Sequence, residues 1–439
     1  MSYKTYDTYE TINNSFLKQM PKDWGMFKLK FLINTLESGK RKDFENETFA
    51  FSIGGEHINW NGTLNLKNER YVSEDFYNSM SKGKICKNDT LLVKDGATIG
   101  KTAFVDDLPQ KMVVNEHVFI LRSNKLLNPK LLYYLIFSNL GFTQIKLTET
   151  GSAQGGISQS IADKVKFIIP INLTHQQQIV DYLDKQTARI DATIVKNEEL
   201  IQLLEEKRVT LINQVVTKGL NPDVPMKESC VEWIGEIPEH WKINKIKKYF
   251  YIYNGSTPKN NEENWNGNID WITPADYKTS DTYINNSSRK ITKKGLNSCG
   301  TTLVPKGSII VSNRAPIGTV AIANVDLCTN QGCKSLVIKR DINTKFVYYV
   351  FSINEKELNK LGRGTTFMEL SAYDLGIFPI PIAPDSEQKD IVNYLDKETS
   401  KINQTVSKIK ENIKLLEEYK TSLIHHVVTG KIDVREEVI

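Results

Sequence analysis

An internal repeat constrains the fold of this chain more than any other feature. Residues 176–217 and 388–429 align without a gap at an offset of 212, and 22 of the 42 aligned positions are identical. The shared blocks include YLDK, LLEE and VVT. A chain that repeats itself at this level folds into repeated modules. The sequence therefore predicts two copies of one structural unit.

The duplication extends beyond these two segments. PKDW at 21–24 matches PEHW at 238–241, and the order of short apolar blocks is the same in both halves. A chain of 439 residues is also too long for one ordinary domain. We predict five segments, which are a mixed region at 14–170, a helix at 171–217, a linker at 218–237, a second mixed region at 238–382 and a second helix at 383–429.

The two repeated segments have the apolar periodicity of coiled-coil helices. Apolar residues recur at steps of mainly three and four, and neither segment contains Pro or Gly before its end. The predicted pairing positions are Ile179, Leu183, Ile190, Ile201, Leu204 and Leu211 in the first helix, and Ile391, Leu395, Ile402, Ile413, Leu416 and Leu423 in the second. A helix with one apolar stripe needs a partner. The other copy in the same chain is favoured over a homodimer, and antiparallel packing is expected.

Each mixed region combines short strands with a few helices. Segments such as TLLV, VFILRS, SIIVS and VAIA are typical of strands, and 131–142 and 346–358 are typical of helices. GATIGKT at 96–102 resembles a phosphate-binding loop, but it has three residues between its glycines where the motif needs four. A turn between two strands is the better interpretation. Each region is predicted to be an α+β domain.

The charge and the loops allow binding to nucleic acid without requiring it. The chain has 57 Lys and Arg against 52 Asp and Glu, a formal net charge of +5. Loops at matching places in the two halves carry amide, hydroxyl and basic side chains, which can contact base edges and phosphates, although polar loops are often only solvated. The predicted DNA-contacting residues are Lys94, Lys101, His117, Gln154, Ser158, Thr257, Lys259, Asp276, Tyr277, Asn313, Arg314, Lys334, Arg363 and Thr365.

No pattern in the sequence indicates catalysis. NPPY-type and glycine-rich methyl-donor motifs are absent, and five scattered cysteines contain no CxxC pair for a structural zinc site. We therefore expect no catalytic residue and no metal ligand. The N-terminal residues lack the apolar stretch of a signal peptide and no long apolar run follows, so a cytoplasmic protein is expected.

Several motifs resemble one known family. The linker string KGLNPDVPMKESCVEWIGEIPEHW at 218–241, WITPAD at 271–276, NQG at 330–332 and the helix start QQQIVDYLDKQTARID are similar to the specificity (S) subunits of type I restriction–modification enzymes. The resemblance covers nearly the whole chain, including its duplication. Cys230 stands where a small residue such as Gly is expected, and IGGEH replaces ITPAD in the first half.

The resemblance implies two tandemly repeated α/β target recognition domains, 14–170 and 238–382. Two long antiparallel coiled-coil helices would join them with pseudo-two-fold symmetry. Each domain would read one half of a bipartite asymmetric DNA site, and the helices would set the spacer.

The resemblance also implies the partners. Two methyltransferase (M) subunits would form an adenine-N6 methyltransferase that uses S-adenosylmethionine, and two restriction (R) motor–nuclease subunits would add ATP- and Mg-dependent cleavage. No cofactor is expected in this chain. Two alternatives stay open, a fused methyltransferase that acts alone and a coiled-coil scaffold without a DNA role.

Overall fold

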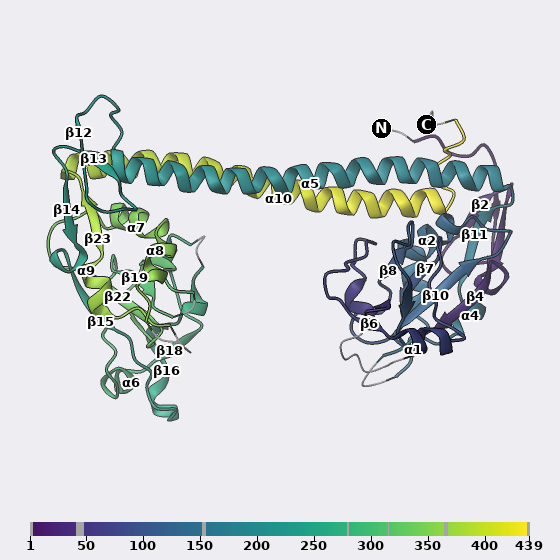
Figure 1. Cartoon of the computed structure of the whole chain (residues 1–439), viewed down its shortest axis with the longest axis horizontal. Coiled ribbons are helices and arrows are strands. Elements are labelled where there is room, and N and C mark those ends of the chain that lie inside the picture. Colours follow the sequence, from purple (N-terminus) through teal and green to yellow (C-terminus); the bar gives the residue numbers. More distant parts are fainter. Residues whose placement is uncertain are drawn as a thin grey trace. The chain divides into compact units, whose positions relative to one another are not determined.

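The structure, a computed structural model, describes residues 3–40, 48–151, 155–278, 281–314, 316–363 and 368–436. It divides into two compact units (Figure 1). Unit 1 consists of 1–197 and 410–439, and unit 2 consists of 198–409. Each unit therefore combines one mixed region with parts of both long helices.

The two long helices are α5 (Leu173–Lys218) and α10 (Asp385–Val428). They begin two residues later than the sequence predicts and end within one residue of the predicted position. Gly219 and Gly430 follow them with φ of +75° and +67°, a conformation that only glycine adopts readily and that stops a helix.

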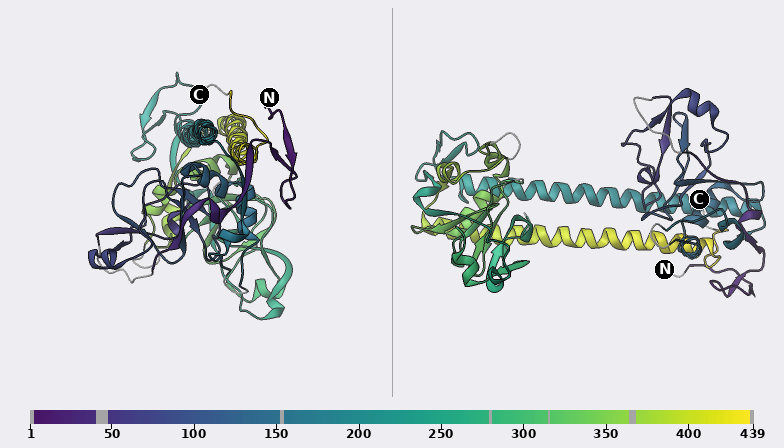
Figure 2. Two further views of the ribbon diagram at one scale, coloured as in Figure 1. Left: turned by 90° about the vertical axis from the view of Figure 1, so that its right-hand side faces the viewer. Right: turned by 90° about the horizontal axis from the view of Figure 1, so that it is seen from below.

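The buried faces of α5 and α10 follow the predicted stripe. In unit 1, Ile179, Leu183 and Ile190 of α5 lie in the same core cluster as Leu423 of α10, with Leu416 packed against it. In unit 2, one cluster contains Ile391 and Leu395 of α10 with Ile212 and Val215 of α5, and Leu211 packs against it. Ile402 is buried, and Ile201, Leu204 and Ile413 are half-buried. Within each unit, the two helix segments lie side by side (Figure 2).

The described residues of unit 1 form two sheets and two small strand pairs. Its elements before α5 are β1 (Tyr9–Thr11), β2 (Gln19–Pro21), β3 (Trp24–Lys28), η1 (Leu29–Phe31), β4 (Ile33–Ser38), β5 (Ala50–Ile53), η2 (Gly55–His57), β6 (Tyr71–Val72), α1 (Glu74–Ser79), β7 (Thr90–Val93), β8 (Thr102–Phe104), β9 (Met112–Val114), β10 (Val118–Ser123), α2 (Pro129–Phe137), α3 (Asn139–Lys146), α4 (Ile161–Lys164) and β11 (Lys166–Pro170). The sheets have the orders β4-β10-β7-β8 and β6-β5-β9, with β5 and β9 parallel.

Unit 2 repeats this topology. Its elements between the long helices are β12 (Met226–Glu228), β13 (Glu236–Pro238), β14 (Lys242–Lys245), η3 (Ile246–Lys248), β15 (Phe250–Asn254), η4 (Glu262–Asn264), β16 (Trp265–Ile272), η5 (Pro274–Asp276), β17 (Tyr283–Ile284), β18 (Arg289–Ile291), α6 (Lys293–Asn297), β19 (Ile309–Ser312), β20 (Val320–Ala323), β21 (Leu327–Thr329), β22 (Cys333–Ile338), α7 (Thr344–Ser352), α8 (Glu355–Lys360), α9 (Ala372–Ile377) and β23 (Pro379–Ile382). The sheet orders are β15-β22-β19-β20-β17 and β18-β16-β21, with β16 and β21 parallel. Both units have mixed α/β content, as predicted.

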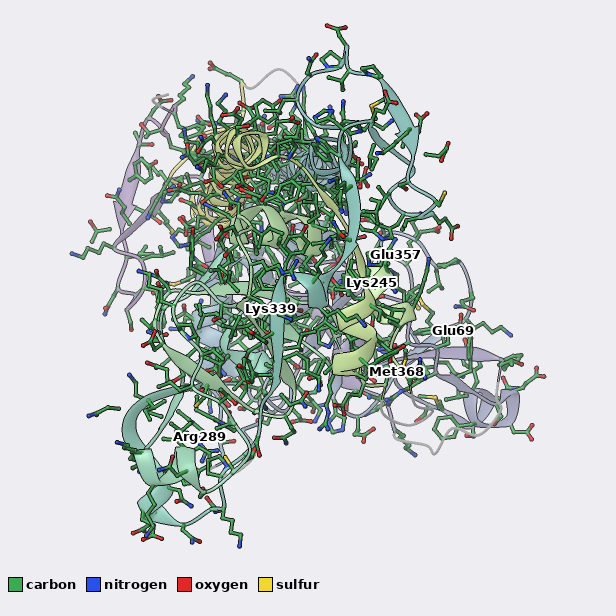
Figure 3. All side chains as sticks on the ribbon, turned by 90° about the vertical axis from the view of Figure 1, so that its left-hand side faces the viewer. Glu69, Lys245, Arg289, Lys339, Glu357 and Met368 are labelled. Atoms are coloured by element: carbon green, nitrogen blue, oxygen red, sulfur yellow. The ribbon has the colours of Figure 1, made fainter. Side chains whose placement is uncertain are left out.

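Unit 2 has an added strand, β17, at the edge of its larger sheet, and a small lobe formed by β16, β18 and α6 stands in the place of β5, β6 and α1. Trp265 and Trp271 pack edge-on, and the Arg289 guanidinium carbon lies 3.6 Å from the centre of the Trp265 ring. Arg289 is on the outer part of this lobe (Figure 3). A guanidinium over an indole face is attracted by the ring quadrupole, so Arg289 closes this small aromatic cluster.

Two local predictions need refinement. The segment 131–142 contains two helices, because Ser138 ends α2 and its hydroxyl accepts a hydrogen bond from the Gly141 N–H of α3 at 3.1 Å. The segment 346–358 likewise spans α7 and α8. The phosphate-loop look-alike at 96–102 begins in the turn between β7 and β8, with Gly96 and Gly100 at positive φ. No helix in the described part of the chain is long and apolar enough to cross a membrane.

Candidate nucleic-acid interface

Loops from several strand ends of unit 2 are joined by backbone hydrogen bonds into one surface. The Ser256 N–H donates to the Thr329 carbonyl at 2.9 Å, and the Asn330 N–H donates to the Ile272 carbonyl at 2.8 Å. The Asn313 N–H donates to the Gly332 carbonyl at 2.9 Å. The loops that carry most of the predicted contact residues of unit 2 therefore do lie together, at one end of both sheets.

Glu369, which the sequence analysis did not single out, is the centre of this surface. Its carboxylate accepts hydrogen bonds from both Nε and Nη2 of Arg314, at 3.2 and 2.9 Å, and from Asn313 Nδ2 at 3.0 Å. Lys334 Nζ lies 3.4 Å from the other side of the carboxylate. Partial burial alone would raise the pKa of Glu369, but the hydrogen bond from Arg314 and the charges of Lys334 and Arg314 lower it below its usual value. Glu369 therefore stays ionised and holds Arg314 in place.

Three of the predicted DNA contacts have buried side chains. Asn313 and Lys334 are 0% and 6% exposed, so they support Glu369 from below and do not face solvent. Tyr277 is 3% exposed, and its hydroxyl lies 3.6 Å from Cys333 Sγ. Burial raises the pKa of the Tyr277 phenol well above its usual value and that of the Cys333 thiol to about 12, so both stay neutral. Arg314, by contrast, keeps 48% of its side chain exposed.

The other predicted residues of unit 2 stay candidates. Arg363 has a side chain that is 78% exposed, and its Nη2 donates to Asp374 at 2.9 Å. Thr257 is exposed and donates to the Gln331 side chain, and Lys259 is exposed. Asp276 is half-buried and accepts hydrogen bonds from the backbone of Thr273 and of Ser288, which hold its loop closed. Thr365 lies outside the described residues.

The matching surface of unit 1 has a different charge. A cavity of about 860 Å³ is lined by Glu56, Asp95, His117 and Glu149, together with glycines of the same loops. Lys94 Nζ forms an ion pair with the Asp95 carboxylate at 2.8 Å, and only 19% of the Lys94 side chain is exposed. His117 is exposed and its Nδ1 lies 3.2 Å from Asp95. Three carboxylates therefore line this surface, and each forms an ion pair, Asp95 with Lys94, Glu56 with Arg70 and Glu149 with Lys146.

The remaining candidates of unit 1 are peripheral. Lys101 Nζ lies 5.8 Å from the centre of the exposed Trp60 ring. Ser158 is exposed, and its hydroxyl donates to Ser160 Oγ at 2.8 Å. Gln154 lies outside the described residues. None of these positions carries the paired guanidinium and carboxylate that characterise unit 2.

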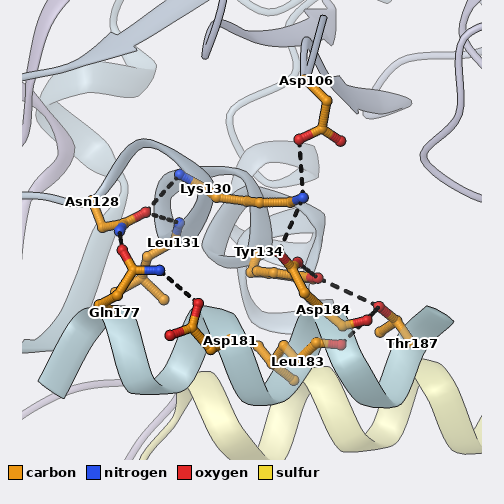
Figure 4. A network of polar contacts seen from close by, with 10 residues as sticks. All are labelled: Asp106, Asn128, Lys130, Leu131, Tyr134, Gln177, Asp181, Leu183, Asp184 and Thr187. Atoms are coloured by element: carbon orange, nitrogen blue, oxygen red, sulfur yellow. Dashed lines mark hydrogen bonds and ion pairs between the residues drawn. The ribbon is translucent and has the colours of Figure 1, made fainter. Parts of the chain in front are cut away.

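A second feature, missed by sequence reasoning, fastens each mixed region to its long helix. In unit 1 the Tyr134 hydroxyl of α2 donates to Asp184 Oδ1 of α5 at 2.6 Å, and Lys130 Nζ lies 3.1 Å from the same carboxylate (Figure 4). Asn128 caps α2 through Lys130 N and Leu131 N. We call the set Asn128, Lys130, Tyr134, Asp184 and Thr187 the anchor of unit 1.

Unit 2 has the same anchor. The Tyr349 hydroxyl donates to Asp396 at 2.5 Å, Lys345 Nζ lies 2.7 Å from that carboxylate, and Asn343 caps α7. Each tyrosine hydroxyl is also 3.4 Å from a threonine hydroxyl, Thr187 in unit 1 and Thr399 in unit 2. The two helices α2 and α7 are therefore bound to α5 and α10 by one repeated polar arrangement.

Comparison with protein families agrees with this duplicated arrangement. The model of the type I restriction modification DNA specificity domain matches the chain twice, at residues 21–203 and 238–415. The chain belongs to this family. Each match contains one mixed region and part of the long helix that follows it, so we call these regions specificity domains 1 and 2.

Relatives and solved structures support the same assignment. The MjaIX specificity subunit of Methanocaldococcus jannaschii is 37% identical over 186 residues, which are 40% of this chain and 43% of that relative. The putative MjaX specificity subunit of the same organism is 25% identical over 435 residues, 97% of both chains.

Two solved structures share the fold. A chain from a structure on complex assembly and conformational transition of the type I restriction–modification system has a TM-score of 0.74, at 17% identity, covering 94% of this chain and 99% of its own length. The HsdS subunit from Thermoanaerobacter tengcongensis has a TM-score of 0.53 at 18% identity, covering 97% and 99% of the two chains.

The sequence repeats the residues of the anchors, although it does not show which of them are in contact. NPKLLYY at 128–134 and NTKFVYY at 343–349 share the Asn, the Lys and both tyrosines at one offset. Their acceptors Asp184 and Asp396 lie at matching positions of the helical repeat. The signal for Glu369 is weaker, because no equivalent carboxylate follows the glycines of domain 1 at the same spacing.

Proposed function

We propose that this chain is the non-catalytic DNA-recognition subunit of a type I restriction–modification complex in the cytoplasm. Each specificity domain reads one half of a bipartite, asymmetric DNA site. The helices α5 and α10 form an antiparallel coiled coil that sets the spacer and docks two methyltransferase subunits. Two restriction subunits complete the enzyme. S-adenosylmethionine, ATP and Mg belong to those partners, and this chain supplies no cofactor site.

One observation carries the proposal, namely that equal anchors hold unequal loop surfaces. The distances in the two anchors agree closely, whereas the loops present carboxylates in domain 1 and a guanidinium held by Glu369 in domain 2. An arginine held in this way can bond the two acceptors of guanine in the major groove, and carboxylates accept from the amino group of cytosine. Two surfaces with different hydrogen-bonding chemistry on equal supports suit two different half-sites.

The test is the base preference of the assembled methyltransferase. We expect Arg314→Ala to relax discrimination at one half-site by roughly 10- to 100-fold, which corresponds to about 1–3 kcal/mol. The other half-site should keep its preference. The measurement is adenine methylation of a randomised duplex library by the complex of this chain with its methyltransferase subunits. Lys306→Ala removes the same charge at an exposed position of domain 2 outside the loop surface and should change nothing.

Arg363→Ala serves as a second variant of the same domain. An equal loss on both half-sites for either arginine would contradict the assignment of one half-site to each domain. Methylation by this chain without partner subunits would instead favour a fused methyltransferase. Binding of the complex to DNA should also weaken steeply with salt, and a salt-independent complex would favour a scaffold.

A further inference from the structure

Domain 2 has a basic pocket at the end of its sheet opposite to the loop surface. A cavity of about 750 Å³ is lined by Ile243, Asn244 and Lys245 of β14, by Lys247 and Lys248 of η3, and by Val231, Lys339 and Pro379. Lys245 and Lys339 lie on the same face of the unit (Figure 3). The floor is apolar and the rim carries four ammonium groups.

These ammonium groups are not neutralised within the described part of the chain. Lys248 Nζ donates to the Asn244 amide oxygen at 2.8 Å, and Lys339 Nζ lies 5.1 Å from the centre of the Tyr251 ring. No ion pair joins Lys245, Lys247, Lys248 or Lys339 to a described carboxylate, and all four are exposed. Four like charges in one cavity repel one another, so an anionic partner would be attracted.

Domain 1 provides the internal comparison. Lys30, at the position that matches Lys247, forms an ion pair with Asp163 at 2.6 Å. Phe31 occupies the position of Lys248. Asn124 occupies the position of Lys339, because the Asn124 N–H donates to the carbonyl of the residue before β4 and the Lys339 N–H donates to the carbonyl of the residue before β15. Domain 1 keeps one lysine of the cluster, Lys28 at the position that matches Lys245, so the full set of four is specific to domain 2 and is not a requirement of the fold.

The strand β14 offers an open edge to this pocket. Its sheet, among the described residues, contains only β14 and β23. Ile243 and Lys245 lie opposite Pro381 and Pro379, which have no N–H to donate. The ladder bonds therefore run through Lys242 and Asn244, and because bonding alternates along an antiparallel pair, the N–H and C=O of Ile243 point to the open edge. An extended segment can add to such an edge.

The position of the pocket argues against contact with the DNA that the loops read. The strand β22 connects the two ends, with Lys334 near the loop surface and Lys339 just beyond the other end. Five residue steps at about 3.3 Å each therefore separate Lys334 from Lys339 by roughly 17 Å. An apolar floor beside a strand edge also fits a peptide better than a phosphate backbone, which is fully polar.

We propose that this pocket binds an acidic, extended segment of a partner protein, which adds as a strand to β14. Its carboxylates pair with Lys247, Lys248 and Lys339, and one apolar side chain covers Ile243, Val231 and Pro379. The choice of a protein over DNA rests on the proposed function, because that function places the DNA at the other end of the sheet.

The probe is a dye-labelled peptide, acetyl-Glu-Val-Glu-Leu-Glu-Val-Glu-amide, titrated with the full chain by fluorescence anisotropy. We expect the variant Lys247→Ala/Lys248→Ala/Lys339→Ala to bind it at least tenfold more weakly than the unmodified chain. Lys293→Ala/Lys306→Ala/Lys356→Ala removes the same charge from exposed positions of domain 2 and should bind as the unmodified chain does. A peptide of the same sequence with an N-methyl group on every residue has no N–H to donate at either edge, so it should also bind at least tenfold more weakly.

Three results would overturn the proposal. The first is equal binding of the peptide by both triple variants, or no binding at all. The second is that the variant Lys247→Ala/Lys248→Ala/Lys339→Ala loses as much affinity for a nonspecific 12-base-pair DNA duplex as it loses for the peptide. This result would identify a site for a phosphate backbone. The third is binding of tripolyphosphate, but not of the peptide, that depends on the three lysines.

Failure of the proposed function would look different. The pocket variant, assembled with methyltransferase subunits, should keep the base preferences of the unmodified complex at both half-sites. An unmodified complex without any base preference would refute DNA recognition by the loops, whatever the peptide titration gives.

Discussion

The anchors and the loop surfaces of the two specificity domains differ in how closely they repeat. Both anchors use Asn, Lys and Tyr on a short helix with Asp and Thr on a long helix, at nearly equal distances. The loop surfaces share a backbone plan but not their charged groups. The polar groups that fix a domain to its helix are thus equivalent, and those that face solvent are not. Support and recognition are carried by separate residues.

A third region, where each domain meets the start of its long helix, is intermediate. In domain 2 the Trp241 indole N–H donates to Glu387 at 2.9 Å, and His240 Nε2 lies 2.7 Å from the same carboxylate. At the matching place in domain 1, His175 replaces Glu387 and bonds the Tyr6 hydroxyl at 2.9 Å. The buried Trp24 indole nitrogen has no hydrogen-bond partner in the described structure. A buried tryptophan is therefore repeated at this place in both domains, but the hydrogen bonds around it differ.

The largest expected effect comes from removing these two tryptophans. Trp24→Ala and Trp241→Ala should each lower the free energy of unfolding by about 3–5 kcal/mol, because both side chains are buried and leave cavities. Trp241→Ala should cost about 1 kcal/mol more, since it also removes the hydrogen bond to Glu387. The measurement is hydrogen exchange of peptides from β3 and β14 in increasing urea. A larger loss of unfolding free energy for Trp24→Ala than for Trp241→Ala would contradict the expectation that the indole without a hydrogen bond stabilises its domain less.

The next effect tests the equivalence of the anchors. Tyr134→Phe and Tyr349→Phe should each cost about 1.5–3 kcal/mol, because each removes a hydrogen bond to a carboxylate at a buried position. The two costs should agree within about 0.5 kcal/mol, which is the usual scatter of independent sites. Tyr133→Phe, next to the anchor, provides the control. Clearly unequal costs would show that similar geometry hides different energetics.

The sequence predicts the anchored scaffold better than the surface that it supports. The heptad stripe of α5 and α10 is read from spacing alone, and the buried positions of both helices follow it. Asn313 stands beside Arg314, and Lys334 follows Gly332 by two residues, so the sequence indicates a loop at both positions. Lys334 is nevertheless buried, because its strand β22 lies between β15 and β19, and one sequence does not distinguish a central strand from an edge strand.

The anchor escaped prediction for a different reason. Tyr134 and Asp184 are 50 residues apart, and only the fold brings a hydroxyl on α2 to a carboxylate on α5. Glu369 is a similar case, since its partner Arg314 is 55 residues away. Side-chain pairs of this kind depend on the tertiary register of two elements, which periodicity within each element does not determine.

A smaller difference between the units should appear in acid. Burial, together with the charge of Lys431 and the neighbouring His426, lowers the pKa of His425 from 6.5 to about 4. The folded state therefore favours the neutral ring, and its contribution to stability is complete above pH 6.5 and is lost as the pH falls toward 4. The matching residue on α5 is Asn213, which does not titrate. Unit 1 should thus lose protection between pH 6.5 and 4.5 more than unit 2 does.

Hydrogen exchange of the C-terminal turns of α10 and α5, compared at the two pH values, measures this difference. His425→Asn gives unit 1 the residue of unit 2 and should remove part of its acid sensitivity. Burial also lowers the pKa of His175, so some sensitivity should persist in this variant. Equal loss of protection in both units before the substitution would contradict the assignment to His425.

The smallest expected effect concerns a charged contact between α5 and α10 in unit 1. Lys420 of α10 lies 2.7 Å from Asp191 of α5, and half of the Asp191 side chain is exposed. The matching residues in unit 2 are Arg208 and Asn403, so no charge pair is possible there. Exposed pairs contribute about 0–1 kcal/mol. Asp191→Asn, which copies unit 2, should therefore lower the free energy of unfolding by at most about 1 kcal/mol.

Lys420→Ala should cost more than Asp191→Asn. Only 14% of the Lys420 side chain is exposed, so its methylene groups cover the apolar seam as well as carrying the charge. A double-mutant cycle separates the two contributions, with urea denaturation as the measurement. A coupling energy above about 1 kcal/mol would mean that the charge pair, and not the apolar stripe that both units share, fixes the register of α5 against α10 in unit 1.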